Sequence, residues 1–156
     1  MREMSKKFRS KELTIFLAIF VLLSDQLSKL FVVANLGLGD SFEVLPFFNI
    51  VRVENTGITF GILKNIAPQF LLIAVSFATI IALLFWIRRN PNFLLPIGVV
   101  IAGALGNIVD RMMRGAVIDF LDFHVYGYHW PAFNIADSAI VIGVFALLII
   151  SYGENS

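Results

Sequence analysis

Long blocks of apolar residues alternate with short polar stretches along the chain. The blocks are apolar all round rather than amphipathic, and each is long enough to cross a bilayer at about 20 residues per span. We therefore predict an all-α integral membrane protein that forms a single four-span domain over residues 1–156. The predicted spans cover about residues 13–36, 67–87, 93–111 and 135–152.

The first block follows a basic cluster, a pattern that is also typical of a secretory signal peptide. We favour a membrane span because Phe31, Val32 and Val33 prolong the apolar run and no small-residue cleavage site follows. Nucleic-acid binding explains the cluster poorly, since a hydrophobic segment follows it at once. The basic residues of the cluster are Arg2, Lys6, Lys7, Arg9 and Lys11.

Basic residues also predict the orientation. The second block has no charged residue, and the turn after it contains Arg88 and Arg89. By the positive-inside rule, this turn and the N-terminal cluster lie on the cytoplasmic side. Both termini are then cytoplasmic, and residues 37–66 and 112–134 are external. Three basic residues depart from this bias because they lie in the external segments: Arg52, Lys64 and Arg114.

Composition supports a membrane protein and narrows the chemistry. Apolar residues make up 58% of the chain and charged residues only 15%, which is low for the surface of a soluble domain. The chain has no cysteine. This excludes a disulfide, a thiolate metal site and a cysteine nucleophile. In the third span, Gly98, Ala102 and Gly106 recur every four residues and predict a face that a neighbouring helix approaches closely.

Ionisable residues of the predicted spans gather toward one membrane face. Asp25 lies about 18 Å along its span from Leu13, at 1.5 Å per residue, and so in the outer part. Asp110 and Arg111 end the third span, and Asp137 lies in the first turn of the fourth. Such groups are costly in a membrane unless they are paired or hydrated, so they indicate a functional site near the outer interface.

Two kinds of catalytic site other than an aspartic protease are compatible with these polar residues. Asp25 and Lys29 share a helix face and are expected to form a neutralised ion pair. A serine–lysine protease using Ser24 or Ser28 is a weak alternative, because Asp25 would keep the lysine protonated. A histidine or zinc site is also weak. His124 and His129 lie among aromatic residues typical of the membrane interface, and no HExxH pattern occurs.

An aspartic protease fits the acidic residues better. It needs two carboxylates that share one proton, so that one activates a water and the other donates to the substrate carbonyl. Spacing alone does not identify the pair. Neutralisation by Arg111, Arg114 or Lys29 is the alternative role, most simply for Asp110 beside Arg111. The candidate carboxylates are Asp110, Asp119, Asp122 and Asp137.

Five motifs in order along nearly the whole chain resemble the lipoprotein signal peptidase (signal peptidase II) family. They are DQLSK (Asp25–Lys29), NTGITFG (Asn55–Gly61), GALGNIVDR (Gly103–Arg111), GAVIDF (Gly115–Phe120) and FNIAD (Phe133–Asp137). The resemblance implies an intramembrane aspartyl endopeptidase whose catalytic pair is Asp119 and Asp137. It also implies that further polar residues contact the substrate or the pair, namely Asn55, Asn107, Asp110, Arg111 and Asn134, with Asp25 and Lys29 as structural supports.

The resemblance further implies the fold and the substrate. The fold would have four transmembrane helices, a small external β-cradle after the first helix and a short interfacial helix before the fourth. The alternating stretch Phe42–Phe60, broken by Pro46 and Gly57, is compatible with short strands. The substrate would be a diacylglyceryl-modified bacterial prolipoprotein, cut before its lipidated cysteine. We expect no metal, organic cofactor or nucleic acid, contact with membrane lipids, and a monomer in the bacterial cytoplasmic membrane.

Two positions depart from the family pattern. Thr59 stands where alanine or serine is usual, and Ala102 replaces a glycine. Both changes are small and leave every ionisable position intact.

Two other classes of function remain: a small transporter or proton-conducting bundle, and a structural scaffold. The transporter would need ionisable groups staggered through the bilayer, whereas the second span has none. A scaffold would leave the polar residues on one side unexplained.

Overall fold

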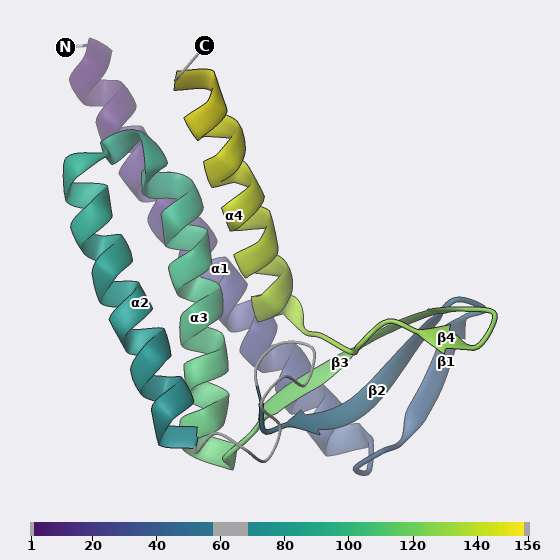
Figure 1. The fold of residues 1–156 in the computed structure, drawn as a ribbon. Coiled ribbons are helices and arrows are strands. Elements are labelled where there is room, and N and C mark those ends of the chain that lie inside the picture. Colours follow the sequence, from purple (N-terminus) through teal and green to yellow (C-terminus); the bar gives the residue numbers. More distant parts are fainter. Residues whose placement is uncertain (1, 58–68, 155–156) are drawn as a thin grey trace.

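The computed structural model describes residues 2–57 and 69–154 (Figure 1). The four long helices form a bundle, and the strands form a small sheet at one end of it, whereas the N- and C-terminal ends lie at the opposite end (Figure 1). The elements in chain order are α1 (Arg2–Asn35), β1 (Ser41–Leu45), β2 (Phe48–Asn55), α2 (Gln69–Arg89), η2 (Pro91–Phe93), α3 (Leu94–Arg114), β3 (Val117–Val125), β4 (Tyr128–His129) and α4 (Ile135–Glu154).

The four predicted spans are confirmed as helices. The stretches long and apolar enough to cross a membrane are Ser10–Asn35, Gln69–Arg89, Pro91–Arg114 and Ile135–Gly153. The predicted start of the second span at Ala67 lies outside the described residues. The third helix continues beyond its predicted end at residue 111, because Asp110 pairs with Arg114 one turn later, at 2.6 Å, and does not break the helix. Gly115, with φ 72°, then ends it.

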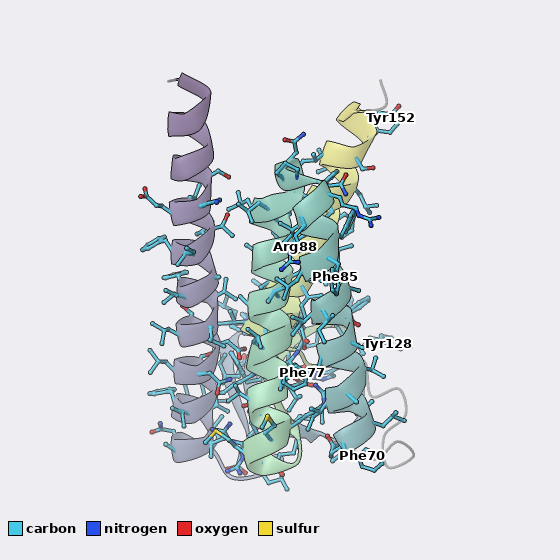
Figure 2. The ribbon with its side chains drawn as sticks, turned by 90° about the vertical axis from the view of Figure 1, so that its left-hand side faces the viewer. Phe70, Phe77, Phe85, Arg88, Tyr128 and Tyr152 are labelled. Atoms are coloured by element: carbon cyan, nitrogen blue, oxygen red, sulfur yellow. The ribbon has the colours of Figure 1, made fainter. Side chains whose placement is uncertain are left out.

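The outward surfaces of the bundle are apolar. Phe70, Phe77 and Phe85 are exposed and are spaced along α2 from one end toward the other (Figure 2). Phe31 on α1 and Phe145 on α4 are also exposed. A soluble monomer does not leave so much contiguous apolar surface in water, whereas lipid accommodates it. The protein is therefore an integral membrane protein.

Small residues let α3 approach α1, as the sequence predicts. A Cβ atom at Gly98 would collide with the Thr14 side chain, and one at Gly106 would collide with the Asp25 carboxylate. Ala102, between them, is buried. Backbones that approach this closely gain dispersion contacts that larger residues would prevent.

A second close contact joins α3 to α4. A Cβ atom at Gly103 would meet the Ala136 carbonyl oxygen, and one at Gly143 would meet the Pro96 carbonyl oxygen and the Val100 side chain. Backbone atoms cannot move aside as a flexible side chain can. The two glycines therefore set the distance between the helix that contains Asn107 and the helix that contains Asp137.

The sheet is antiparallel, in the order β1-β2-β3-β4, and takes strands from both segments that connect helices at this end. The strands β1 and β2 confirm the prediction for the stretch from Phe42, with Pro46 in the turn between them, as far as residue 57. Val32 of α1 packs against Ile118 and Phe120 of β3 and attaches the sheet to the bundle.

The interfacial helix expected before the fourth span is wrong. Residues 115–134, all of which are described, contain β3 and β4 and no helix. β3 is rich in β-branched and aromatic residues, which favour strands. Pairing with β2 and a bridge between Leu121 and Phe133 give its backbone groups hydrogen-bond partners across the sheet.

Four buried or partly buried charges lie where α1 meets α3. Lys29 Nζ lies 2.8 Å from Asp25 Oδ2 and 2.8 Å from Asp110 Oδ2, and all three side chains have no solvent exposure. The pair of Asp25 and Lys29 was predicted and is confirmed. Arg114 binds the second oxygen of Asp110, so two cations balance two anions. Removing one partner from such a group leaves an uncompensated charge in an apolar interior.

We predict that Gly103→Ala lowers the free energy of unfolding by about 1–3 kcal/mol, the usual cost of overpacking. Helix propensity alone would favour alanine by about 1 kcal/mol, so the sign of the change distinguishes the two effects. Gly153→Ala is the control, because nothing lies within 4 Å of its added Cβ. Thermal unfolding in detergent would measure both, and equal stability of the two variants would contradict the tight contact.

We also predict that Lys29→Met lowers the free energy of unfolding by about 3–5 kcal/mol, because the buried Asp25 then loses its cation while Asp110 keeps Arg114. Glu54→Gln is the control, since it breaks the partly exposed pair with Arg52 and should cost less than about 1 kcal/mol. Denaturant titration in detergent measures both losses. A small loss for Lys29→Met would mean that water reaches the cluster.

Candidate active site

Asp119 is a buried carboxylate near the start of β3. Its strand position is fixed by pairing with Val53 on β2, next to an irregularity in the β2–β3 register. Asn55 Nδ2 donates to Asp119 Oδ2 at 2.9 Å, and Asn134 Nδ2 donates to Asp119 Oδ1 at 2.7 Å. Each oxygen of the carboxylate therefore accepts a hydrogen bond from a different asparagine.

Asp137 lies in the first turn of α4, and Asn134 caps this turn. The Asn134 side-chain oxygen accepts the backbone N–H of Asp137 at 2.8 Å, which is an N-terminal cap. The other end of the same amide donates to Asp119. One buried side chain thus binds the carboxylate of the strand and the backbone of the helix. Negative charge at the first turn of a helix is favoured by the free N–H groups and the helix dipole.

Asn107 completes the connection between the two aspartates. Its Nδ2 donates to Asp137 Oδ1 at 2.8 Å, and its Oδ1 accepts from Lys29 Nζ at 3.1 Å. Asn134 Nδ2 also lies 3.4 Å from Asn107 Oδ1. Asp119 and Asp137, which come from different elements, are therefore joined by two buried amides.

Burial raises the pKa of Asp119 to about 7, and the negative charge of Asp137 acts in the same direction. The hydrogen bonds from Asn55 and Asn134 and the charge of Lys29 act in the opposite direction but are weaker. Near neutral pH, the Asp119 side chain is therefore poised between its protonated and ionised forms. Such a group can donate or accept a proton in a reaction.

The other two candidate carboxylates have different partners. Asp110 pairs with Lys29 and Arg114, and also accepts the Ile118 N–H at 3.3 Å. Its expected pairing with the adjacent Arg111 is not found, because neighbouring residues on a helix point in different directions. Asp122 accepts from Asn49 and contacts His129. Asp110 and Asp122 therefore do not bind the two amides that join Asp119 to Asp137.

Arg111 extends to the loop after β2 instead. Its guanidinium donates to the Gly57 carbonyl oxygen at 2.9 Å and, more weakly, to the Asn107 carbonyl oxygen at 3.4 Å. It is close enough to Asp119 and Asp137 to interact with both electrostatically. The guanidinium therefore holds the backbone at Gly57 near the two carboxylates and adds positive charge beside them.

The alternative sites are not assembled. Ser28 Oγ donates to the Asp25 carbonyl oxygen, and Lys29 is bound to carboxylates rather than to a serine. His124 and His129 stack on each other at 4.8 Å between ring centroids. No cluster of three His, Asp or Glu side chains that could hold a metal occurs in the described part of the chain.

One polar contact was missed from the sequence. Gln26 donates to Asp25 Oδ2 at 3.1 Å and to the Gly106 carbonyl oxygen at 3.2 Å. The signal was available, since a glutamine inside an apolar span needs a partner.

Of the two departures from the family pattern, Ala102 is buried in α3, and Thr59 lies outside the described residues.

Comparison with known proteins shows which family the chain is similar to. Residues 17–152 match the protein family described as signal peptidase (SPase) II. The lipoprotein signal peptidase of Alteromonas mediterranea is 42% identical over 97% of this chain and 87% of its own length. That of Thermodesulfovibrio yellowstonii is 42% identical over 90% and 93%. That of Shewanella baltica is 46% identical over 86% and 81%.

Solved structures share the fold as well. A bacterial membrane enzyme solved at 2.3 Å resolution superposes with a TM-score of 0.83 and 36% identity, over 92% of this chain and 89% of that one. A second, at 1.9 Å, gives a TM-score of 0.77 and 37% identity over 88% and 90%. The fold thus recurs in these structures over nearly the whole chain, and the chain belongs to the signal peptidase II family.

Proposed function

We propose that the protein is an intramembrane aspartyl endopeptidase that removes signal peptides from diacylglyceryl-modified bacterial prolipoproteins. Asp119 and Asp137 are its catalytic pair. The observation that carries this proposal is the buried amide network, in which Asn134 and Asn107 join these two carboxylates while Asp110 and Asp122 bind other partners.

The pair can share one proton in a defined way. Asp119 carries it near neutral pH, because burial and the charge of Asp137 raise its pKa. Asp137, at the N-terminus of α4, carries the negative charge and accepts a proton from the attacking water. Asp119 donates its proton toward the scissile carbonyl oxygen. When the C–N bond breaks, the leaving amine takes up a proton from Asp137, and a hydroxyl of the tetrahedral intermediate returns a proton to Asp119. The pair thus regains its starting state, and the products are a carboxylic acid, which ionises in water, and a new N-terminal amine.

The surrounding residues then have supporting roles. Asn55, Asn107 and Asn134 hold the carboxylates through hydrogen bonds. Arg111 stabilises the backbone near Gly57 and negative charge that develops on the substrate. Asp25, Lys29 and Asp110 hold α1 against α3. No step in this scheme requires a metal or an organic cofactor.

The substrate enters from the lipid. A signal helix lies in the bilayer, and acyl chains on the cysteine would place the scissile bond near the end of the bundle that contains the sheet. The basic N-terminal cluster and Arg88 and Arg89 put the other end in the cytoplasm. The active site then lies near the outer leaflet of the bacterial cytoplasmic membrane, and the enzyme works as a monomer.

Proton conduction is the second candidate that the polar residues allow. It would need ionisable groups along the whole thickness of the bundle. In the described residues, the charged network instead lies at the end with the sheet, and α2 is without charge between Gln69 and Ile87. This distribution favours a reaction at one end of the bundle over proton conduction through it.

We predict that Asp119→Asn and Asp137→Asn each lower kcat for cleavage of a diacylglyceryl-prolipoprotein by at least about 10²–10⁴-fold, because each removes a proton-transfer group. The assay uses purified protein with a synthetic lipidated substrate, and gel shift reports cleavage. Both variants should still accumulate in membranes, since asparagine keeps the size of the side chain.

Asp122→Asn is the matched control. Asp122 lies three residues further along β3 and is buried, yet it binds Asn49 and His129 rather than the amide network. Its substitution should leave kcat within a few-fold of the wild-type value. Near-normal cleavage by Asp119→Asn or Asp137→Asn, or a loss equal to theirs in Asp122→Asn, would contradict the assignment.

The pH dependence should follow Asp119. Its pKa of about 7 lies above the ordinary value of 3.8, so the shared-proton state is lost as pH rises through about 7. We predict a descending limb of kcat/KM there. Asn55→Ala removes a hydrogen bond that favours the ionised form, so it should move this limb to higher pH. A limb that moves to lower pH, or does not move, would contradict the role of Asp119.

A further inference from the structure

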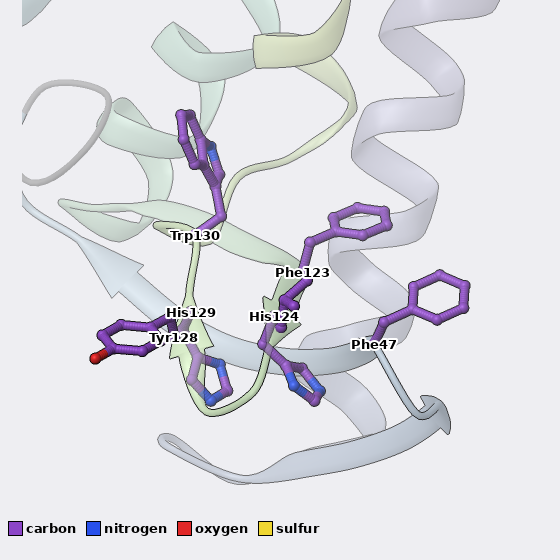
Figure 3. Close-up of a pocket in the computed structure, with 7 residues that line it drawn as sticks. Phe47, Phe123, His124, Tyr128, His129 and Trp130 are labelled. Atoms are coloured by element: carbon purple, nitrogen blue, oxygen red, sulfur yellow. The ribbon is translucent and has the colours of Figure 1, made fainter.

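The hairpin ends of the sheet carry a cluster of aromatic and apolar side chains far from the catalytic pair. The two hairpins lie side by side, since the Phe48 and Phe123 rings stack at 4.7 Å between centroids and the His124 N–H donates to the Phe47 carbonyl oxygen at 3.0 Å. We call the exposed side chains here the aromatic tip: Phe47, Phe123, Val125, Tyr126, Tyr128 and Trp130. All of these except Tyr126 line, together with His124 and His129, a pocket of ≈ 380 Å³ (Figure 3).

The turn at the aromatic tip keeps a tyrosine in an unfavourable conformation. Tyr126 and Gly127 have φ of 50° and 80° and form the two-residue turn between Val125 and Tyr128. Such a turn suits asparagine, aspartate or glycine, and a bulky residue is strained there. The Tyr126 side chain gains nothing from its own chain in return, because it is 98% exposed. A partner outside the chain would explain why an aromatic ring is held in this position.

The height of the aromatic tip along the bundle indicates which partner this is. The sheet extends to the side of the bundle, and its hairpin ends lie level with the start of α4 (Figure 1). Tyr128 lies at a height between Phe77 and Phe85 of α2, well inside the end of the helix marked by Phe70 (Figure 2). Phe77 is eight residues into α2 from Gln69, or about 12 Å at 1.5 Å per residue.

The chemistry of the aromatic tip suits lipid at this depth. Phe and Val are apolar, whereas Tyr and Trp combine an apolar ring with one polar group, as in the aromatic belts of membrane proteins. The described segment from Phe123 to Trp130 contains no Asp, Glu, Lys or Arg. The apolar surface of the aromatic tip therefore continues the lipid-facing surface of the helices at the same level.

We propose that the aromatic tip inserts into the phospholipid leaflet beside the bundle and anchors the sheet there. β3 joins the aromatic tip to the catalytic region, because Val125 is six residues from Asp119, or about 20 Å at 3.3 Å per residue. The anchor thus sets the depth and tilt of the strand that carries Asp119. This proposal concerns the surface alone and does not depend on the reaction proposed above.

Fluorescence quenching in lipid vesicles tests the proposal, because the chain has only two tryptophans, Trp86 and Trp130. Trp86→Phe leaves Trp130 as the reporter, and Trp130→Phe leaves Trp86 in a membrane helix as the positive control. The vesicles contain phosphatidylcholine with bromine on the acyl chains. We expect the bromolipid to quench Trp130 about as strongly as Trp86, and aqueous iodide to quench Trp130 weakly.

Three results would overturn the proposal. The first is quenching of Trp130 by iodide but not by bromolipid, which means that the aromatic tip lies in water. The second is protection of Trp130 from iodide only after a prolipoprotein peptide is added, which means that it binds substrate. The third is protection that appears only at high protein density in the vesicles, which means that it contacts a second copy of the chain.

Tyr126→Asn separates anchoring from folding. Asparagine fits the left-handed turn, so the variant should unfold at an equal or higher temperature than the parent. It should nevertheless reduce the bromolipid quenching of Trp130 and leave that of Trp86 unchanged. Unchanged quenching of Trp130 in this variant would overturn the anchoring role of the ring. A fall in unfolding temperature would mean that the ring acts within the fold.

Discussion

A lysine ammonium group with no contact to solvent lies where α1 meets α3, and the candidate active site is arranged around it. An ammonium group has three N–H donors, and here each has one acceptor: Asp25, Asp110 and the side-chain oxygen of Asn107. In an apolar bundle, an unpaired charge of this kind would be too costly to keep. The positions of these acceptors are therefore tightly constrained.

The constraint extends from the charge to the two proposed catalytic carboxylates. Because Asn107 turns its oxygen toward Lys29, its N–H₂ group must face Asp137. Asp25 also accepts the backbone N–H of Ala136 at 2.9 Å, which holds the first turn of α4. The same cation thus orients the amide that binds Asp137 and fixes the backbone beside it. Networks in which each donor has an acceptor are rigid, and a reaction that needs two carboxylates in register benefits from that rigidity.

The sequence was sufficient to predict the features that depend on a local pattern of residues. Apolar blocks predicted the spans, and the spacing of Asp25 and Lys29 predicted their ion pair, because both follow from helix geometry alone. Contacts between distant segments were different. The pairing of β3 with β2 needs a register between residues 62 to 75 apart in the sequence, and nothing in either segment specifies it. The interfacial helix was expected from the family resemblance, and it was wrong because this pairing makes the segment a strand. Likewise, spacing could not choose Asp119 over Asp110 or Asp122. That choice came from the family motif, and it depends on amides that meet only in the folded chain.

The two proposed catalytic carboxylates are held by elements of different kinds. Asp137 belongs to a helix packed against α3 through Gly103 and Gly143, where backbone atoms leave no room for movement. Asp119 belongs to a strand of a small sheet, attached to the bundle by the cluster of Val32, Ile118 and Phe120 and by hydrogen bonds such as that from Arg52 to the Leu36 carbonyl oxygen. A sheet of this size has little stability of its own. The distance between the carboxylates therefore depends on how firmly the sheet is held at both ends of β3. At the near end, Asn134 binds Asp119 and caps α4 with the same amide. At the far end, insertion of the aromatic tip into lipid would supply the second attachment, so that the membrane itself helps to keep the pair in register.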